Sequence, residues 1–381
     1  MRPIQMVDTN TQYHRIKSKV DLAVLEVMES SAFINGKPVR DFAENFAAYS
    51  GAKHCIPCAN GTDALQIALM ALDLQPGDEV ITPSFTYIAT TEVMALLHLT
   101  PVFAEVDPKT FCLDASTIEK LITSKTKAIV PVHLYGQAAP MEEIMAIAKK
   151  NNLYVIEDNA QATGCEYIFS DKTKKKTGTI GHIGTTSFYP SKNLGAFGDG
   201  GAIFTEDDAL ATKIKMIANH GQSKKYYHDV VGCNSRLDTI QAAILDIKLK
   251  HLDEYILARR KAADNYDAAF AGKKKIITPL RATYTRHVFH QYTLVLDGDK
   301  DPVSRRDGLN EFLASHKIPS MIYYPVPCHR QKMFEHFAVS SAALPVTDWL
   351  TERVISLPMH TELDEEQLLF ITTKILEYIN K

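Results

Sequence analysis

The chain has 381 residues, of which 45% are hydrophobic and 23% are charged, a composition typical of a folded protein with two domains of ordinary size. Its formal net charge of -3 argues against a nucleic-acid-binding protein, which usually carries an excess of basic residues. No run of about 18 apolar residues predicts a membrane span. The first ten residues lack the apolar segment of a secretory signal, so we expect a cytoplasmic protein.

Short β-prone runs alternate with helical patterns from about residue 54 to residue 220. Strands are predicted over 54–58, 79–83, 101–106, 128–132, 153–157, 185–189 and 202–205. Helices are predicted between them over 63–72, 89–97, 116–122 and 141–150. Alternating strands and helices require crossover connections, so the pattern predicts an α/β fold with a largely parallel sheet buried on both faces.

The pattern changes after residue 219. Residues 237–270 read as one long helical region, which leads into a smaller α+β unit. That unit is predicted to contain strands over 273–277 and 291–296 and helices over 305–316 and 364–379. We therefore expect a large domain over residues 1–250, which includes the N-terminal segment, and a small C-terminal domain over residues 251–381.

Lys192 lies in a turn-rich loop directly after a predicted strand, within SFYPSKNLGAFGDGGAIFT (residues 187–205). Glycines crowd behind it, and a second β-prone run follows at once. A solvated charge is unusual in such a setting. The placement favours an amine that reacts reversibly with carbonyl compounds, which is Schiff-base chemistry.

Two further features carry candidate chemistry. Asp158 follows the strand at 153–157, at the sheet edge where parallel strands present ligands. It could contact a metal, a ribose hydroxyl or a protonated ring nitrogen, or simply cap the next turn. Asn60, Gly61, Thr62 and Asp63 link a strand to a helix, which suits a phosphate but is also an ordinary turn with an N-cap.

Other patterns carry less weight. Cys55 and Cys58 form a C-x-x-C pair, but no second pair completes a zinc site and the pair leads into a loop. We therefore expect neither a metal site nor a redox site there. His287 and His290 have no recognisable third ligand, so a core or surface role is expected for both. Neither a nicotinamide fingerprint nor a nucleoside-triphosphate loop is present.

Taken in order, NGTDALQIAL, PSFTYIAT, VIEDNAQATG, SFYPSKNLGAFGDGG and GCNSRLDTIQAA resemble the DegT/DnrJ family of nucleotide-sugar aminotransferases, which use pyridoxal 5′-phosphate. The resemblance extends over essentially the whole chain. It implies the aspartate-aminotransferase-like fold (fold type I). That fold has a large domain with a mostly parallel seven-stranded sheet and a smaller α+β C-terminal domain.

The resemblance also implies roles for individual residues. Lys192 would bind the cofactor covalently, and Asp158 would face the pyridine nitrogen. A carboxylate there favours the protonated ring, which accepts electrons from the substrate. Phe85 would stack on the ring, and Gln161 would lie near the 3′-oxygen.

Further residues are implied around the phosphate and the substrate. The phosphate would be held by Gly61, Thr62 and Ser187, together with Asn234 of the partner subunit. Three residues would lie near the substrate, again contributed across the dimer: Arg236, Tyr324 and His329.

The activity implied is transfer of the amino group of L-glutamate to a nucleotide-linked 3-keto-sugar by a homodimer. The substrate that matches best is UDP-2-acetamido-2-deoxy-3-oxo-D-glucuronate, and the product would serve polysaccharide or lipopolysaccharide O-antigen synthesis. A dTDP-3-oxo-6-deoxyhexose or a 4-keto-sugar is the alternative. Relatives that remove a hydroxyl carry histidine in place of the lysine, so Lys192 favours transamination. A non-catalytic regulator is disfavoured because Lys192, Asp158 and the phosphate loop are all intact.

Overall fold

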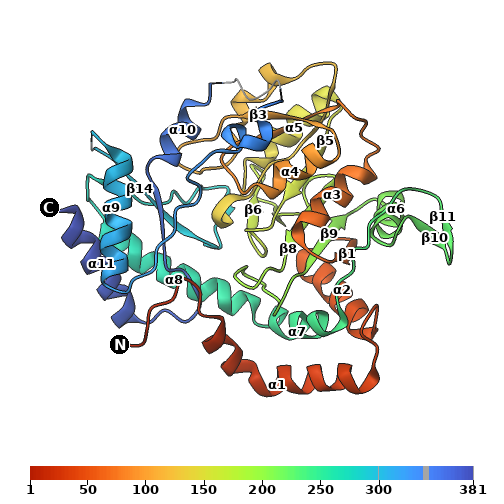
Figure 1. The fold of residues 1–381 in the computed structure, drawn as a ribbon, viewed down its shortest axis with the longest axis horizontal. Coiled ribbons are helices and arrows are strands. Elements are labelled where there is room, and N and C mark those ends of the chain that lie inside the picture. Colours follow the sequence, from red (N-terminus) through yellow and green to blue (C-terminus); the bar gives the residue numbers. More distant parts are fainter. Residues whose placement is uncertain (299, 338–342, 381) are drawn as a thin grey trace.

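The computed structural model describes residues 1–298, 300–337 and 343–380. A seven-stranded sheet forms the centre of the large domain (Figure 1). Its strands lie in the order β1 (His54–Cys58), β9 (Gly201–Thr205), β8 (Ile183–Ser187), β5 (Tyr154–Asp158), β4 (Thr126–Ile129), β2 (Glu79–Pro83) and β3 (Thr100–Ala104). Only β9 runs antiparallel to its neighbours in this sheet. The predicted α/β class and the mostly parallel sheet are confirmed.

Alternate residues of the central strands enter two different cores. Val80, Ala128 and Ile156 pack with helices α3 (Gly61–Ala71), α4 (Ala89–Leu96) and α6 (Asp208–Ala218). Their neighbours on the opposite face pack with α2 (Lys37–Ser50), α5 (Met141–Asn151) and α7 (Thr239–Leu249). The sheet is therefore buried on both faces, as parallel sheets are.

Two predicted helices differ from the structure. The helix expected over 116–122 is a pair of short 3₁₀ turns, Ala115–Thr117 and Glu119–Leu121. The long region over 237–270 is divided into α7 and α8 (Leu252–Phe270) by Lys250 and His251. Asp253 and Glu254 occupy the first turn of α8, where negative charge stabilises a new helix start.

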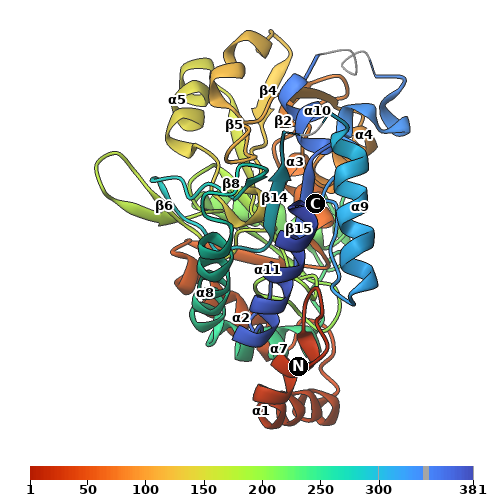
Figure 2. The ribbon, with the colours of Figure 1, turned by 90° about the vertical axis from the view of Figure 1, so that its left-hand side faces the viewer.

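The C-terminal part contains a three-stranded sheet of β12 (Ile276–Ile277), β14 (Tyr292–Leu296) and β15 (Val354–Leu357). Helices α8, α9 (Pro302–Ser315) and α11 (Glu365–Ile379) pack around it (Figure 2). The sequence predicts no separate bounds for β15, although VTDWLTERVISLPMH (residues 346–360) reads as helix-and-strand core, which agrees with this strand. The remaining elements are α1 (Thr9–Ser30), β6 (Glu166–Ile168), β7 (Lys174–Lys176), β10 (Gln222–Lys224), β11 (Tyr227–His228), β13 (Thr285–Arg286) and α10 (Pro345–Thr351).

The N-terminal residues lie against this C-terminal part, although α1 packs on α7. Arg2 forms an ion pair of 3.1 Å with Asp364, and the carbonyl of Met6 accepts a hydrogen bond from the N–H of Met359. The N-terminus thus connects both parts of the molecule. A domain boundary at residue 250 stays a proposal, supported by the break between α7 and α8.

None of the helices in the described residues combines the length and the apolar character that crossing a bilayer requires.

A buried carboxylate fixes the end of the central strand β5. Glu157 is completely buried and accepts hydrogen bonds from the His133 ring and from the backbone N–H groups of Gly178, Ile180 and Gly181. Burial alone would raise its pKa, but His133 and the backbone donors outweigh burial and hold the pKa below its ordinary value. Glu157 therefore contributes to stability as an anion.

We predict that Glu157→Gln lowers the free energy of unfolding by about 3 kcal/mol, because both carboxylate oxygens accept and an amide NH₂ would face a donor at either position. Glu119→Gln, which alters an exposed pair with Lys150, is the control and should change little. Urea denaturation measures both. Because the folded pKa of Glu157 is depressed, its contribution is present above its unfolded pKa of about 4.3 and is lost as pH falls further. Equal pH profiles for the wild type and Glu157→Gln would contradict this assignment.

Candidate active site

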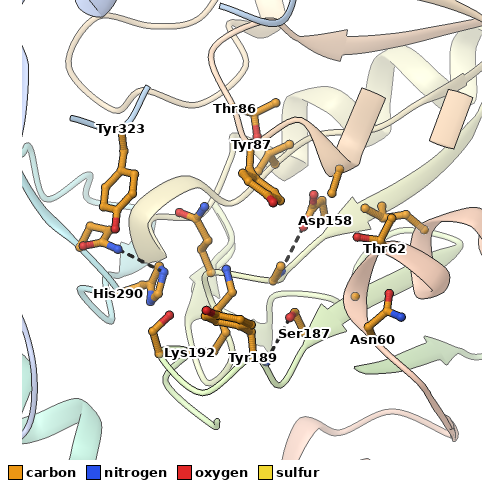
Figure 3. A pocket seen from close by; sticks show the side chains of 18 of the residues that line it. Asn60, Thr62, Thr86, Tyr87, Asp158, Ser187, Tyr189, Lys192, His290 and Tyr323 are labelled. Carbon is orange, nitrogen blue, oxygen red and sulfur yellow. Dashed lines mark hydrogen bonds between the residues drawn. The ribbon is translucent and has the colours of Figure 1, made fainter. Parts of the chain in front are cut away.

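A cavity of about 630 Å³ lies beyond the carboxyl ends of β5 and β8. It brings together Lys192, Asp158 and the loop before α3 (Figure 3). The expected site residues that line it are Gly61, Thr62, Asp158, Gln161, Ser187, Lys192 and Tyr324. Segments far apart in the sequence therefore meet at the sheet edge where a parallel sheet presents its ligands.

The Lys192 loop is held in a tight conformation. The backbone N–H of Lys192 donates to the Tyr189 carbonyl at 2.8 Å, and Ala196 donates to Phe188 at 2.7 Å. A Cβ on Gly195 would meet the Pro190 carbonyl oxygen at 2.4 Å, so only glycine permits this close approach. The glycines behind Lys192 thus serve the compact turn that presents the lysine.

Helix α7 supports the same loop from outside the cavity. The Lys248 ammonium donates to the Gly195 carbonyl, and the Gln241 side chain bonds both the N–H and the carbonyl of Phe197. Lys248 is almost fully buried. The loop is therefore fixed by side chains as well as by its own backbone.

The environment of Lys192 favours a reactive amine. Burial lowers its pKa to about 8, although the nearby Asp158 carboxylate partly opposes this shift. An ordinary lysine has a pKa of about 10.4 and is a poor nucleophile at neutral pH. A larger fraction of Lys192 is consequently uncharged and able to attack a carbonyl carbon.

Asp158 is the last residue of β5 and is 5% exposed. Its Oδ2 accepts a hydrogen bond of 2.7 Å from the Thr90 hydroxyl, and its Oδ1 accepts one of 3.1 Å from the N–H of Ala160. These contacts fix the orientation of the carboxylate at the cavity wall. Such a carboxylate suits a protonated ring nitrogen better than a mobile surface group does.

The N-terminus of α3 forms the opposite end of the cavity (Figure 3). Asn60 caps the helix through a 2.8 Å bond from the Asp63 N–H to its side chain. A Cβ on Gly61 would meet the Cβ of Ser187 at 2.6 Å, so glycine lets the helix start approach β8. Helix-terminal N–H groups and the hydroxyls of Thr62 and Ser187 are suited to bind an anion, and we call this end of the cavity the anion site.

Gln161 and Tyr324 form one wall of the cavity within a single chain. The Gln161 Oε1 accepts from the N–H of Tyr135 at 2.7 Å, and its Nε2 donates to the Tyr324 hydroxyl at 3.0 Å. Tyr324 was expected to reach the site across a dimer. The structure corrects that expectation, because Tyr324 lies in the cavity of its own chain.

Phe85 was expected to stack on a cofactor ring, and the structure corrects this expectation too. Its side chain is completely buried and its ring packs against Phe111, Tyr135 and Tyr324. The aromatic side chain that lines the cavity from this segment is Tyr87, which is 55% exposed. The conformation of the turn after β2 points Phe85 into the core. The sequence does not reveal this conformation.

Three other expected residues lie outside the lining of this cavity. His329 is buried, and its Nδ1 is 2.7 Å from the Ser84 hydroxyl, behind the cavity wall. It does not line the cavity of its own chain. Asn234 is exposed, and Arg236 borders a separate hollow and donates to Asn219 at 3.1 Å. Neither completes the site of its own chain.

The structure adds residues that sequence reasoning missed. His290, Gln291 and Tyr323 line the side of the cavity away from the anion site (Figure 3). His290 belongs to the HVFH segment, which was interpreted as core or surface. Its nearness to Lys192 depends on tertiary packing, and no local pattern signals it.

The C-x-x-C pair lies within β1 and is not arranged as a redox or metal site. Cys55 and Cys58 are three residues apart in a strand and pack into the cores on opposite faces of the sheet. Both thiols are buried enough to raise their pKa values, which disfavours the thiolate. Among the described residues, no group of His, Cys, Asp or Glu side chains is arranged to hold a metal ion.

The model of the DegT/DnrJ/EryC1/StrS aminotransferase family matches residues 14–376. The chain belongs to this family. It is similar over 98% of both chains to the pleiotropic regulatory protein of Geobacillus stearothermophilus, with 46% identity. It is 45% identical to the UDP-2-acetamido-2-deoxy-3-oxo-D-glucuronate aminotransferase of Pseudomonas aeruginosa, over 97% of this chain and 98% of the relative. The chain is therefore an aminotransferase with sugar-modifying relatives.

The fold agrees with a solved structure of this family. S. venezuelae DesV, in complex with a ketimine intermediate, superposes with a TM-score of 0.94, at 36% identity and with all of both chains covered. The predicted aspartate-aminotransferase-like architecture is confirmed by this similarity.

The family uses pyridoxal 5′-phosphate as its cofactor. The residues present suit that group. A Cβ added to Gly61 would collide with the side chain of Ser187, so only glycine fits there. The N–H groups at the start of α3 suit a phosphate. Lys192 supplies a low-pKa amine for an aldehyde, and Asp158 supplies a fixed carboxylate for a ring nitrogen.

Proposed function

We propose that this aminotransferase transfers the amino group of L-glutamate to the ketone of a nucleotide-linked 3-keto-sugar. The best candidate is UDP-2-acetamido-2-deoxy-3-oxo-D-glucuronate, on which the P. aeruginosa relative acts by name. The observation that carries the catalytic part is the convergence of Lys192, Asp158 and the α3 anion site in one cavity. The product would enter surface polysaccharide or O-antigen synthesis in the cytoplasm.

Each cavity residue has a separate task in this proposal. Gly61, Thr62 and Ser187 hold the phosphate, and Asp158 holds the proton of the ring nitrogen. When bound, pyridoxal 5′-phosphate supplies an electron sink that stabilises the carbanion formed at the substrate carbon. Gln161 would contact the cofactor ring near its 3′-oxygen, and Tyr87 would cover the ring. The phosphate contacts would keep the cofactor in the cavity when it is not linked to Lys192.

Lys192 also acts on the substrate itself. Once released, its Nζ would take the proton from the substrate carbon that carries the amino group and would deliver it to C4′, the cofactor carbon to which the lysine had been linked. The lowered pKa of about 8 matches this task, because a base works best with a pKa near the working pH. Two half-reactions that share one lysine should produce ping-pong kinetics.

The charge distribution supports a homodimer with shared sites. Lys192 is the only basic side chain other than neutral His290 among the described residues that line the cavity. Glutamate carries two carboxylates and the nucleotide two phosphates, which need further cations. Asn234 and Arg236 lie outside their own cavity, so we propose that a second subunit supplies them.

A regulatory role is the second candidate, favoured only by the names of two relatives, the pleiotropic regulatory protein of G. stearothermophilus and the erythromycin biosynthesis sensory transduction protein of Saccharopolyspora erythraea. A cavity that keeps a low-pKa lysine, a fixed carboxylate and an anion cradle supports catalysis over a purely regulatory role. A dTDP-3-oxo-6-deoxyhexose or a 4-keto-sugar remains the alternative substrate.

We predict that glutamate bleaches the absorbance of the cofactor-loaded protein and that a UDP-linked 3-keto-sugar restores it. Parallel incubations with dTDP-linked 3-keto- and 4-keto-sugars, analysed by mass spectrometry, separate the alternatives. The UDP-3-keto-glucuronate should give the largest kcat/KM. Turnover of only the dTDP-sugars would contradict the substrate, and turnover of none with full cofactor loading would favour the regulatory role.

We also predict that inactive Lys192→Ala and Arg236→Ala proteins regain activity when they are unfolded together and refolded as a mixture. One site in each mixed dimer would combine an intact Lys192 with an intact Arg236, so about a quarter of wild-type activity is expected for random pairing with shared sites. Arg40→Ala, which also alters the hollow beside Arg236, is the matched control and should stay active alone. No recovery in the mixture would contradict shared sites.

A further inference from the structure

Among the described residues that line the cavity, the polar groups without a hydrogen-bond partner include the Lys192 ammonium, Nδ1 of the His290 imidazole and the Thr86 hydroxyl. The Lys192 ammonium forms neither an ion pair nor a side-chain hydrogen bond among these residues, although it lies in the cavity with Asp158. His290 lines the same cavity, is 4% exposed, and has a buried Nδ1 without a partner. The ammonium can only donate, and the imidazole can accept.

The position of His290 is fixed by its backbone. Arg259 of α8 donates to the carbonyls of Phe289 and His290, each at 3.3 Å, and to that of Met359 at 2.8 Å. The N–H of Gln291 donates to the Tyr135 carbonyl at 3.3 Å. A buried arginine and the Tyr135 carbonyl thus fix the backbone on both sides of the His290 Cα.

The histidine segment is also tied to the lysine loop. Asn193, which directly follows Lys192, donates through its side-chain amide to the Val288 carbonyl at 3.2 Å. This hydrogen bond ties the two segments together next to Lys192. Figure 3 shows Lys192 between His290 on one side and the anion site on the other.

Burial and the nearby positive charges keep the His290 imidazole neutral. Burial lowers its pKa well below the ordinary value, and the positive charges of Lys192 and Arg259 lower it further. The other titratable groups that line the cavity are Tyr87, Asp158, Tyr189, Asp199, Tyr323 and Tyr324. A neutral imidazole always retains one nitrogen lone pair.

The tautomer that leaves Nδ1 free has a local explanation. The amide nitrogen of Gln291 lies 3.5 Å from Nε2 of His290. The amide nitrogen and oxygen exchange places on a 180° rotation of the amide. In the rotated form Nε2–H donates to the Gln291 oxygen and the lone pair stays on Nδ1. Gln291 would then select the tautomer, as second partners of histidines commonly do.

We propose that the His290 imidazole accepts a hydrogen bond from the Lys192 ammonium whenever this lysine is not covalently bound to the cofactor, and so raises its proton affinity. His290 is then a positioning residue that acts through Lys192. His290 would thus give the released lysine a neutral acceptor in addition to the carboxylate of Asp158, whose charge also acts on Lys192. The inference rests on the role proposed for Lys192, but it concerns a property of the cofactor-free chain.

The test measures the pKa of Lys192 in the cofactor-free protein, by competitive acetylation at a series of pH values with mass spectrometry of the Lys192 peptide. Removal of the acceptor in His290→Leu should lower this pKa by about one unit, since hydrogen bonds favour the charged form. His290→Gln keeps an acceptor and should stay near the wild type. An unchanged or raised pKa in His290→Leu overturns the proposal.

His287→Asn is the matched control. His287 is also buried and stacks on Phe289 with ring centroids 3.9 Å apart, but it does not line the cavity. Its Nδ1 accepts from the Phe289 N–H at 2.9 Å, and an asparagine oxygen can replace that acceptor. The pKa of Lys192 should not change in this variant. A shift equal to that in His290→Leu would mean that loop packing causes the effect, and would overturn the proposal.

A second measurement uses the wild-type fold and does not depend on His290→Leu. The ¹⁵N resonances of His290 in cofactor-free protein should show an unprotonated Nδ1, whose shift changes as Lys192 titrates and stops changing in Lys192→Met. A proton on Nδ1 overturns the proposal. Neither measurement uses substrate, so a protein that fails to transaminate any keto-sugar would leave both results interpretable.

Discussion

The pairing of β5 with β8 is the constraint on which the site depends. Asp158 lies opposite Thr185 in the parallel register, and β8 continues two residues further to Ser187 before the Lys192 loop begins. Glu157 and Asp158 are adjacent carboxylates that point to opposite faces of the sheet. Glu157 is satisfied by His133 and the 178–181 loop, which leaves Asp158 for the cavity. A slip of one residue would exchange the two acids and leave a buried charge without donors.

Much of this arrangement could be predicted from the sequence because it depends on local patterns. The alternation of strands and helices, the strand before Asp158 and the glycines after Lys192 each specify a short segment. The parallel topology then brings their carboxyl ends to one edge. Lys192, Asp158 and the Gly61–Thr62 helix start were identified in this way, and all of them line the same cavity.

The sequence-based expectations that differ from the structure concern side chains whose orientation depends on contacts with residues far away in the chain. Phe85 and Tyr87 are two aromatic residues in one turn, and only the cluster with Phe111 and Tyr135 decides that Phe85 is buried. His290 belongs to an irregular segment, and its position depends on Arg259 of α8, which donates hydrogen bonds to the carbonyls of Phe289 and His290. The hydrophobic pattern does not mark the break between α7 and α8, because Leu249 and Leu252 on either side of it pack in the same core.

In the cavity, the cost of burying charged groups is opposed by fixed dipoles and charges of the protein. Burial makes the Lys192 amine nucleophilic, while Asp158 limits the shift of its pKa. The rigid loop, held by Lys248 and Gln241 of α7, reduces the conformational entropy lost when the lysine is placed for reaction. The anion cradle needs no charged side chain of its own, because backbone N–H groups and hydroxyls supply it.

The central claim is that Lys192 is the residue that binds pyridoxal 5′-phosphate covalently. Borohydride reduction of the cofactor-loaded protein, followed by peptide mass spectrometry, tests it most directly. The account predicts a phosphopyridoxyl group on the peptide that contains Lys192, and its loss in Lys192→Ala. A modification on Lys248 or on a surface lysine, with the Lys192 peptide unmodified, would contradict the account.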